Sequence, residues 1–219
     1  MTYKTRLPRC VIWSLLAFTF LLGIGTPGCG HWAGPLPLGK DNKARATNDV
    51  ASNTWAQPMD LPGLPNLHKV SDDLYRGAEP TVEGIQQLKK LGIKTVVDLR
   101  SLGVADDVQG TGMTYVRIRS TAWQPDDKAV TQFLQIVTDK SRTPVFVHCQ
   151  RGADRTGMMT AIYRVAVQGW TKDQAIAEMT EGGFGFYSGW QNIVRYVRDL
   201  DIERVKSAVV RPPAGAPNP

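Results

Sequence analysis

The sequence predicts an α/β fold in which a central, mainly parallel sheet is flanked by helices. From about Val70 onward, short β-branched apolar segments alternate with amphipathic segments of helical length, as in a parallel sheet with helical crossovers. Residues 144–148 (PVFVH) are almost continuously apolar, which is typical of a strand in the middle of such a sheet. Because ligands of these folds bind at the carboxyl ends of the strands, functional residues are expected directly after this segment.

Local patterns predict the individual elements. Four segments have the alternating or continuous apolar pattern of strands, and they span residues 74–76, 94–99, 114–118 and 144–148. Five segments have apolar side chains at helical spacing, and they span residues 81–91, 126–137, 155–168, 172–179 and 188–207. Gly92 and Gly169 follow two of these helices and are expected to end them.

Length and composition place the chain among ordinary globular proteins. Its 219 residues are 42% hydrophobic and 21% charged, which fits one domain with extensions and excludes a wholly disordered or multi-span membrane protein. The net charge of +6 is concentrated in residues 1–45, which carry six basic residues and one acidic residue. The remaining chain is nearly neutral, so no nucleic-acid partner is expected.

The first 29 residues have the pattern of an export leader. Three basic side chains precede residues 11–25 (VIWSLLAFTFLLGIG), which carry no charge and are too short for a comfortable transmembrane helix. Residues 26–29 (TPGC) partly resemble a bacterial lipoprotein processing box, in which Cys29 would be lipidated; cleavage near Gly25 and an uncleaved anchor are the alternatives. The folded domain is therefore expected outside the cytoplasm, in the periplasm or cell envelope, either anchored to a membrane surface or secreted.

The composition also predicts the domain boundaries. Residues 30–67 are rich in Gly, Pro, Asn and Ala and lack sustained periodicity, so we expect a flexible tether there. A folded domain is expected over residues 68–210. Residues 211–219 (RPPAGAPNP) offer little apolar surface and are expected to form a disordered tail.

The central apolar strand leads into a motif that can bind an anion. Residues 148–157 read HCQRGADRTG, with five residues between Cys149 and Arg155. A loop of this length can curl so that successive backbone N–H groups point inward, at the N-terminus of the following helix. Arg155 offers a planar fork of donors to two phosphate oxygens, and the same surroundings favour a reactive thiolate at Cys149. Gly152 allows a close backbone approach.

This stretch resembles the H-C-x5-R-[ST]-G signature of the cysteine-dependent protein tyrosine and dual-specificity phosphatases. Two further segments, residues 74–80 (LYRGAEP) and 95–100 (TVVDLR), look like the opening of the atypical dual-specificity phosphatases and their bacterial relatives. The resemblance implies a phosphatase-type P-loop between strand and helix, and a catalytic domain over residues 68–210. A rhodanese-like domain, which also carries a cysteine-centred loop, is a minor alternative.

The resemblance implies roles for individual residues. Cys149 would form a phosphocysteine intermediate, Thr156 would donate its hydroxyl to the sulfur, and His148 would orient the cysteine. Neither a metal nor a cofactor is expected. Arg76 and Arg100 would contact the phosphate or, in the favoured interpretation, form salt bridges within the scaffold. The phosphate-binding residues would be those of the loop: Gln150, Arg151, Gly152, Ala153, Asp154 and Arg155.

The general acid has three candidates. Residues 123–126 (WQPD) look like the Trp-Pro-Asp loop of the family with one residue inserted, which favours Asp126. Asp127 follows it, and both aspartates have an alternative role as helix caps. Asp154 competes because some bacterial relatives carry an aspartate just before the loop arginine.

The sequence therefore predicts a phosphomonoester hydrolase of the protein tyrosine or dual-specificity type. Its partners would be a phosphorylated protein or a small phosphomonoester, together with a membrane surface reached through the N-terminal anchor. Two alternatives are a phosphoinositide or inositol phosphate phosphatase and a phosphate-binding module that does not turn over its ligand. The acid at Asp154 argues weakly against a highly phosphorylated substrate, because it balances Arg151 in the loop.

Overall fold

A six-stranded sheet with the order β1-β2-β3-β6-β4-β5 contains four adjacent parallel strands, from β3 to the edge strand β5. The computed structural model describes residues 55–102 and 107–210. The expected leader, most of the expected tether and the tail from residue 211 lie outside the described residues. The parallel strands are β3 (Leu74–Gly77), β6 (Val145–His148), β4 (Thr95–Asp98) and β5 (Thr114–Arg117). This arrangement confirms the predicted α/β class.

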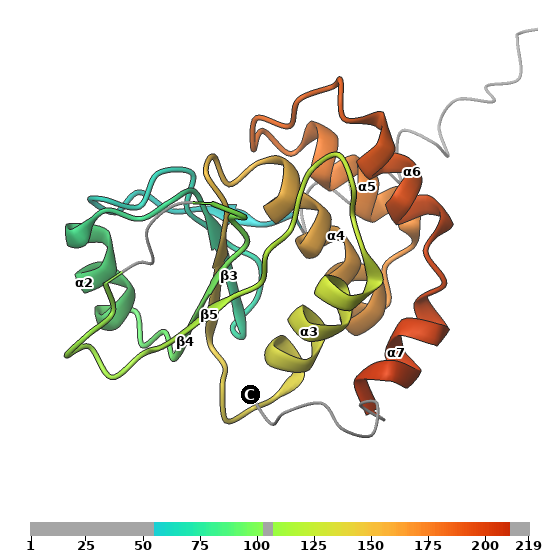
Figure 1. Cartoon of the computed structure of the whole chain (residues 1–219). Coiled ribbons are helices and arrows are strands. Elements are labelled where there is room, and N and C mark those ends of the chain that lie inside the picture. Colours follow the sequence, from blue (N-terminus) through green and yellow to red (C-terminus); the bar gives the residue numbers. More distant parts are fainter. Residues whose placement is uncertain (1–54, 103–106, 211–219) are drawn as a thin grey trace, which may run out of the picture. The chain divides into compact units, whose positions relative to one another are not determined.

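Side chains of the central strands alternate between two apolar layers, because successive residues of a strand point to opposite faces. In β6, Val145 and Val147 enter one layer and Phe146 enters the other. Helix α2 (Val82–Lys90) packs in the layer with Phe146, and Figure 1 shows it on the opposite side of the sheet from the remaining helices. Those helices are α3 (Asp127–Thr138), α4 (Asp154–Gln168), α5 (Lys172–Glu181), α6 (Gln191–Asp199) and α7 (Ile202–Val210).

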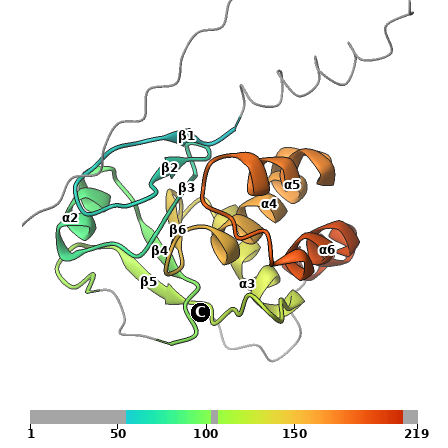
Figure 2. The same ribbon diagram turned by 90° about the horizontal axis from the view of Figure 1, so that it is seen from above.

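The strand register brings the carboxyl ends of the parallel strands into one row. Gly77 pairs with His148, His148 pairs with Asp98, and Asp98 pairs with Arg117. The residues that follow these positions therefore meet at one edge of the sheet. Figure 2 shows β6 leading toward α4 from between β3 and β4.

The last predicted helix is divided in two. Residues 188–207 were expected to be continuous, but α6 ends at Asp199 and α7 begins at Ile202. The side chain of Asp201 accepts a hydrogen bond from the backbone N–H of Arg204 at 3.0 Å, as an N-cap residue does. Asp201 therefore starts a new helix, although the helical spacing of apolar residues continues without a break across this position.

The domain begins earlier than residue 68. Residues 57–58 form β1, which pairs antiparallel with β2 (His68–Lys69), and Leu64 and Leu67 are buried against α2. The part of the expected tether that the structure describes is therefore packed on the domain. Its Pro and Gly residues indicated flexibility, whereas its leucines supply the buried contacts. In the described part of the chain, no helix has the length and apolar character needed to cross a membrane.

Candidate active site

The loop of residues 149–155 connects β6 to α4 at the shared edge of the sheet. Cys149 follows the last residue of β6 and is almost fully buried, and Asp154 is the first residue of α4. The strand, loop and helix thus follow each other as the sequence predicted. The N-terminus of α4, with its partial positive charge, faces the loop that carries the thiol.

Hydrogen bonds from outside the loop hold three of its carbonyl groups. Within the described residues, no acceptor is paired with the backbone N–H groups of residues 150–153. A loop whose carbonyls are bonded outward and whose N–H groups lack acceptors has the form of an anion-binding nest. The carbonyls and their donors are Gln150 with the N–H of Glu79 at 3.4 Å, Arg151 with Asn66 Nδ2 at 2.9 Å, and Gly152 with Arg76 Nη2 at 2.8 Å.

Gly152 is required by both its conformation and its surroundings. Its φ angle is 70°, in the left-handed region that favours glycine. A Cβ atom at this position would overlap the carbonyl group of Gly77 at the end of β3. The loop can therefore curl against β3 only with glycine at position 152, as the sequence analysis expected.

Arg155 lies across the mouth of the loop. Its Nη1 atom donates to the carbonyl of Leu99 at 3.3 Å and, more weakly, to that of Ser120 at 3.5 Å. Its other guanidinium nitrogens have no partner among the described residues, so part of the donor fork remains for an anion. The contacts come from the segments after β4 and β5, which fix the side chain at the shared edge.

His148 precedes the loop of residues 149–155 and Thr156 follows it, and both are fully buried. The hydroxyl of Thr156 has no hydrogen-bond partner within the described part of the chain, which leaves it available to the sulfur. His148 stacks on Phe146 at 5.6 Å between ring centroids, and its Nε2 atom lies 4.0 Å from Asp98 Oδ1. These contacts suit the expected role of His148 in orienting the cysteine.

The remaining loop side chains turn to neighbours at the rim. Gln150 Nε2 donates to Glu79 at 3.1 Å, and Arg151 pairs with Asp154 at 2.9 Å. Their contribution to phosphate binding would therefore come through their backbone N–H groups. In residues 55–102 and 107–210, no group of three His, Cys, Asp or Glu side chains could hold a metal ion.

A carboxylate surrounded by donors lies on the β4–β5 side of the loop. Asp98 is fully buried and accepts hydrogen bonds from Arg100 Nε at 2.9 Å, Tyr115 OH at 2.6 Å and Arg117 Nη2 at 2.9 Å. Burial alone would raise the pKa of Asp98, but the hydrogen bonds from Arg100 and Tyr115 hold it well below its usual value. Arg100 also pairs with Glu79, so it belongs to the scaffold, as favoured from the sequence.

A second buried cluster lies on the β3–α5 side. Arg76 is fully buried, with its guanidinium 3.7 Å above the ring of Phe184 and its Nη2 atom on the Gly152 carbonyl. Nearby, Arg164 makes two hydrogen bonds to Glu178, at 2.6 and 2.7 Å. Arg76 therefore supports the loop from behind and does not reach a phosphate inside it. The expected salt bridge is replaced by a hydrogen bond to the loop backbone.

Asn66 was not among the residues predicted to support the site, because it lies in the expected tether. Its φ angle is 56°, a left-handed conformation that Asn adopts more readily than most residues, and its amide also donates to the Phe184 carbonyl at 2.9 Å. The three-residue spacing of Leu61, Leu64 and Leu67 was the available signal that this segment packs on the domain.

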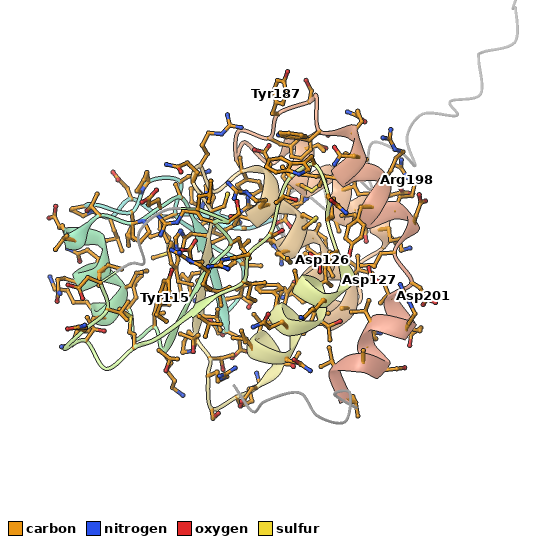
Figure 3. The ribbon with its side chains drawn as sticks, in the orientation of Figure 1. Tyr115, Asp126, Asp127, Tyr187, Arg198 and Asp201 are labelled. Atoms are coloured by element: carbon orange, nitrogen blue, oxygen red, sulfur yellow. The ribbon has the colours of Figure 1, made fainter. Side chains whose placement is uncertain are left out.

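The three candidate general acids have different surroundings. Asp126 is exposed, and its side chain caps α3 by accepting a hydrogen bond from the N–H of Ala129 at 2.9 Å. Asp127 accepts from Tyr196 OH at 2.8 Å with one oxygen and pairs with Arg204 through the other. Figure 3 shows both aspartates at the start of α3.

Asp154 uses both carboxylate oxygens within the scaffold. One accepts from the backbone N–H of Tyr187 at 2.9 Å and the other from Arg151 at 2.9 Å. Asp154 thereby ties the start of α4 to the segment between α5 and α6. Its position in the loop, which made it a candidate acid, is explained by this structural role.

Known proteins resemble this chain in sequence and in structure. A family model described as a DSP-PTPase phosphatase fused to NAD+ kinase matches residues 65–192. The dual specificity protein phosphatase TpbA of Pseudomonas aeruginosa is 37% identical over 180 residues, which cover 80% of each protein. Its crystal structure aligns with a TM-score of 0.62 and 33% identity, over 72% of this chain and 97% of that one.

Two further structures extend the comparison. A complex of a TpbA variant with phosphotyrosine aligns with a TM-score of 0.62 and 32% identity, over 72% of this chain and 97% of that one. The catalytic domain of the SIW14 phosphatase from S. cerevisiae shares the fold, with a TM-score of 0.61 and 20% identity over 69% of this chain and 94% of that one. The chain therefore belongs to the dual-specificity phosphatase family and is a phosphomonoester hydrolase of the protein tyrosine and dual-specificity type.

Proposed function

We propose that the chain hydrolyses phosphotyrosine esters with Cys149 as the nucleophile and Arg155 as the phosphate ligand. The observation that supports this proposal is the loop of residues 149–155, in which three carbonyl groups accept hydrogen bonds from outside the loop, next to the buried thiol of Cys149. The thiolate sulfur attacks phosphorus, the bond to the leaving oxygen breaks, and a phosphocysteine forms. Water then attacks the phosphocysteine and releases inorganic phosphate and the free thiolate.

Burial of Cys149 favours an aryl phosphate as the substrate. The cysteine is only 2% exposed, so the phosphate must pass below the rim of the loop to meet it. A phenyl ring holds phosphorus farther from the peptide backbone than a seryl or threonyl side chain does. The phosphotyrosine complex of TpbA shows that a relative binds this group. Arg151 is paired with Asp154, which leaves the rim without the excess of positive charge that suits inositol polyphosphates.

We assign the general acid to Asp126. Of the three candidates, it is the one with a carboxylate oxygen that has no partner among the described residues. It lies on the segment between β5 and α3, which also supplies the Ser120 carbonyl to Arg155. A protonated Asp126 would give its proton to the leaving oxygen and afterwards accept one from the attacking water.

Replacement of the two loop residues tests the nucleophile and the phosphate ligand. Cys149→Ser should lower kcat for p-nitrophenyl phosphate by about 10⁴-fold or more, because an alcohol is a far weaker nucleophile at neutral pH. Arg155→Lys should lower kcat/KM by about 10²-fold, because an ammonium group lacks the two-donor fork. Activity is measured with a metal chelator present. A Cys149→Ser protein with wild-type turnover contradicts the proposal.

The assignment of Asp126 has a matched control in its neighbour. Asp126→Asn should lower kcat by about 10²-fold and remove the basic limb of the pH–rate profile, because the variant cannot deliver a proton. Asp127→Asn changes the same charge one residue away and should keep that limb, since Asp127 is engaged with Tyr196 and Arg204. An unchanged pH profile in Asp126→Asn removes Asp126 from the mechanism.

We also propose that the domain works outside the cytoplasm, tethered through Cys29. The support is the charged N-terminal segment, the apolar run of residues 11–25 and the TPGC box. Expression of the full chain followed by cell fractionation should find the protein in the membrane fraction. Cys29→Ser should move it to the soluble extracytoplasmic fraction, and an unchanged membrane fraction in this variant contradicts lipidation as the anchor.

A further inference from the structure

A nest of inward N–H groups requires that the carbonyls of the same peptides point outward. A buried carbonyl without a donor is costly, and this holds for the Gly152 carbonyl, whose hydrogen bond from Arg76 is buried. The hydrogen bond from Asn66 to the Arg151 carbonyl is exposed, so it orients that carbonyl without protecting a buried group. Arg76 and Asn66 are the two side chains that supply such donors, to Gly152 and Arg151. They come from β3 and from the segment before β2, 76 and 85 residues away from their acceptors in the chain.

Arg76 is also an incompletely compensated cation. Its Nε and Nη1 atoms have no hydrogen-bond partner among the described residues, and the Phe184 ring covers its guanidinium at 3.7 Å. The carboxylate that acts on Arg76 electrostatically, Glu178, already accepts hydrogen bonds from Arg164 at both oxygens. The three charged side chains together carry one net positive charge inside the protein, next to the loop that holds the thiol.

This surplus charge favours an anion at Cys149. Burial lowers the pKa of Arg76 to about 10, while the negative charges of Glu178 and Cys149 oppose that shift. Arg76 therefore stays protonated at neutral pH, and its attraction to the thiolate acts on both partners. The charged and titratable groups that surround Arg76 and the loop are His68, Glu79, Asp98, His148, Cys149, Arg151, Asp154, Arg155, Arg164 and Glu178.

We propose that Arg76 and Asn66 are positioning residues of the catalytic loop. Both hold loop carbonyls outward so that the N–H groups remain available to phosphate, and Arg76 in addition places the positive charge that stabilises the Cys149 thiolate. Neither side chain touches the substrate. The inference rests on the proposed role of Cys149 and of the loop, and it goes beyond that role by naming what keeps them competent.

Alkylation of Cys149 by iodoacetamide tests the proposal without any catalytic turnover. The reagent reacts with the thiolate, so the rate as a function of pH reports the thiolate fraction. Inorganic phosphate that occupies the loop protects Cys149, and the concentration that gives half-protection reports phosphate binding. Both quantities are measured on the full chain by mass spectrometry of the peptide that contains Cys149.

Arg76→Gln and Arg76→Met should shift the half-maximal pH of alkylation upward by about one unit, because both remove the charge behind the thiolate. Arg76→Lys keeps the charge and should restore most of the wild-type profile. Arg195→Gln changes an exposed arginine of α6 in the same way and should alter nothing. If Arg76→Met does not fold, as judged by thermal melting, Arg76→Gln and Arg76→Lys carry the comparison.

Asn66→Gly tests the hydrogen bond to the Arg151 carbonyl without changing any charge. Glycine accepts the φ angle of 56° at this position, so the backbone is kept while the amide donor is lost. The variant should need about five- to tenfold more phosphate for half-protection, since one net hydrogen bond is worth about 1 kcal/mol, and its alkylation profile should stay at the wild-type pH.

Two results overturn the proposal. A folded Arg76→Gln protein that alkylates as the wild type does would show that Arg76 does not support the thiolate. An Asn66→Gly protein with wild-type phosphate protection would show that Asn66 does not position the loop. Failure of the proposed function has a different signature, because a wild-type protein that hydrolyses no phosphomonoester can still give the alkylation and protection curves expected here.

Discussion

The two buried charge clusters beside the loop are built in opposite ways. On the β4–β5 side, Asp98 receives hydrogen bonds from two arginines and a tyrosine, and Glu79 pairs with one of these arginines, so two carboxylates balance two guanidinium groups. On the β3–α5 side, Arg76 and Arg164 lie near one carboxylate, Glu178, whose oxygens accept hydrogen bonds from Arg164 and from the N–H of Ala56. The first cluster is saturated with donors, whereas the second is short of acceptors.

This difference separates scaffolding from support of the chemistry. A cluster whose charges are already balanced gains little from another anion nearby, so the role of Asp98 and its partners is to hold the strand ends together. A cluster with surplus positive charge is stabilised by an anion nearby, and the nearest loop carries the thiol. Three predictions test the comparison, from the largest expected effect on stability to the smallest.

Glu178→Gln should have the largest effect. It leaves Arg76 and Arg164 buried without a carboxylate, and a lone member of a buried ion pair costs about 3–5 kcal/mol of unfolding free energy. Urea unfolding at neutral pH measures this loss. Glu181→Gln removes the same charge from an exposed position of α5 and should leave the urea midpoint unchanged. Equal midpoints for the two variants would contradict the surplus of buried positive charge.

Asp98→Asn should cost less at neutral pH, about 2–3 kcal/mol, because Arg117 is 20% exposed and water can replace part of its lost partner. The folded pKa of Asp98 lies below its unfolded value of about 4, so its ionised form stabilises the fold above that pH. The contribution is lost as the pH falls below about 4. The urea midpoint of the wild type should therefore fall toward that of Asp98→Asn on acidification.

An exposed aspartate supplies the control for this pH dependence. Asp60→Asn alters a side chain for which the structure shows no partner among the described residues, and its acid unfolding should follow the wild type. A gap between wild type and Asp98→Asn that is as wide at pH 3 as at pH 7 would contradict the assignment.

Tyr115→Phe should have the smallest effect, about 1 kcal/mol. It removes one donor from Asp98, but the two arginines remain and the site is partly open to solvent, which screens the loss. Burial, together with the hydrogen bond to the Asp98 carboxylate, raises the pKa of Tyr115 to about 12. Absorbance titration should accordingly show two late-ionising tyrosines, Tyr115 and Tyr196, because burial and a hydrogen bond to Asp127 also raise the pKa of Tyr196. Tyr115→Phe should remove one of them, whereas Tyr187→Phe, which changes an exposed side chain, should keep both.

Helices and strands whose boundaries follow from the local sequence pattern were predicted closely. The predicted strands 114–118 and 144–148 and the helices 126–137 and 172–179 agree with the structure to within two residues at each end. The errors came where local signals conflicted. Asp201 caps a new helix inside an apolar periodicity, and the leucines of residues 61–67 pack on the domain within a segment whose composition resembles a linker.

The sequence by itself determined the strand, the loop and the helix that carry Cys149 and Arg155, together with the requirement for Gly152. These residues are close in the chain, and their geometry follows from strand and helix propensity and from backbone conformation. Only the tertiary structure decided what stands behind the loop, since Arg76, Asn66 and Glu178 reach it from distant elements. Burial sets the strength of a charge or hydrogen bond, and burial is a property of the assembled layers that no short segment encodes.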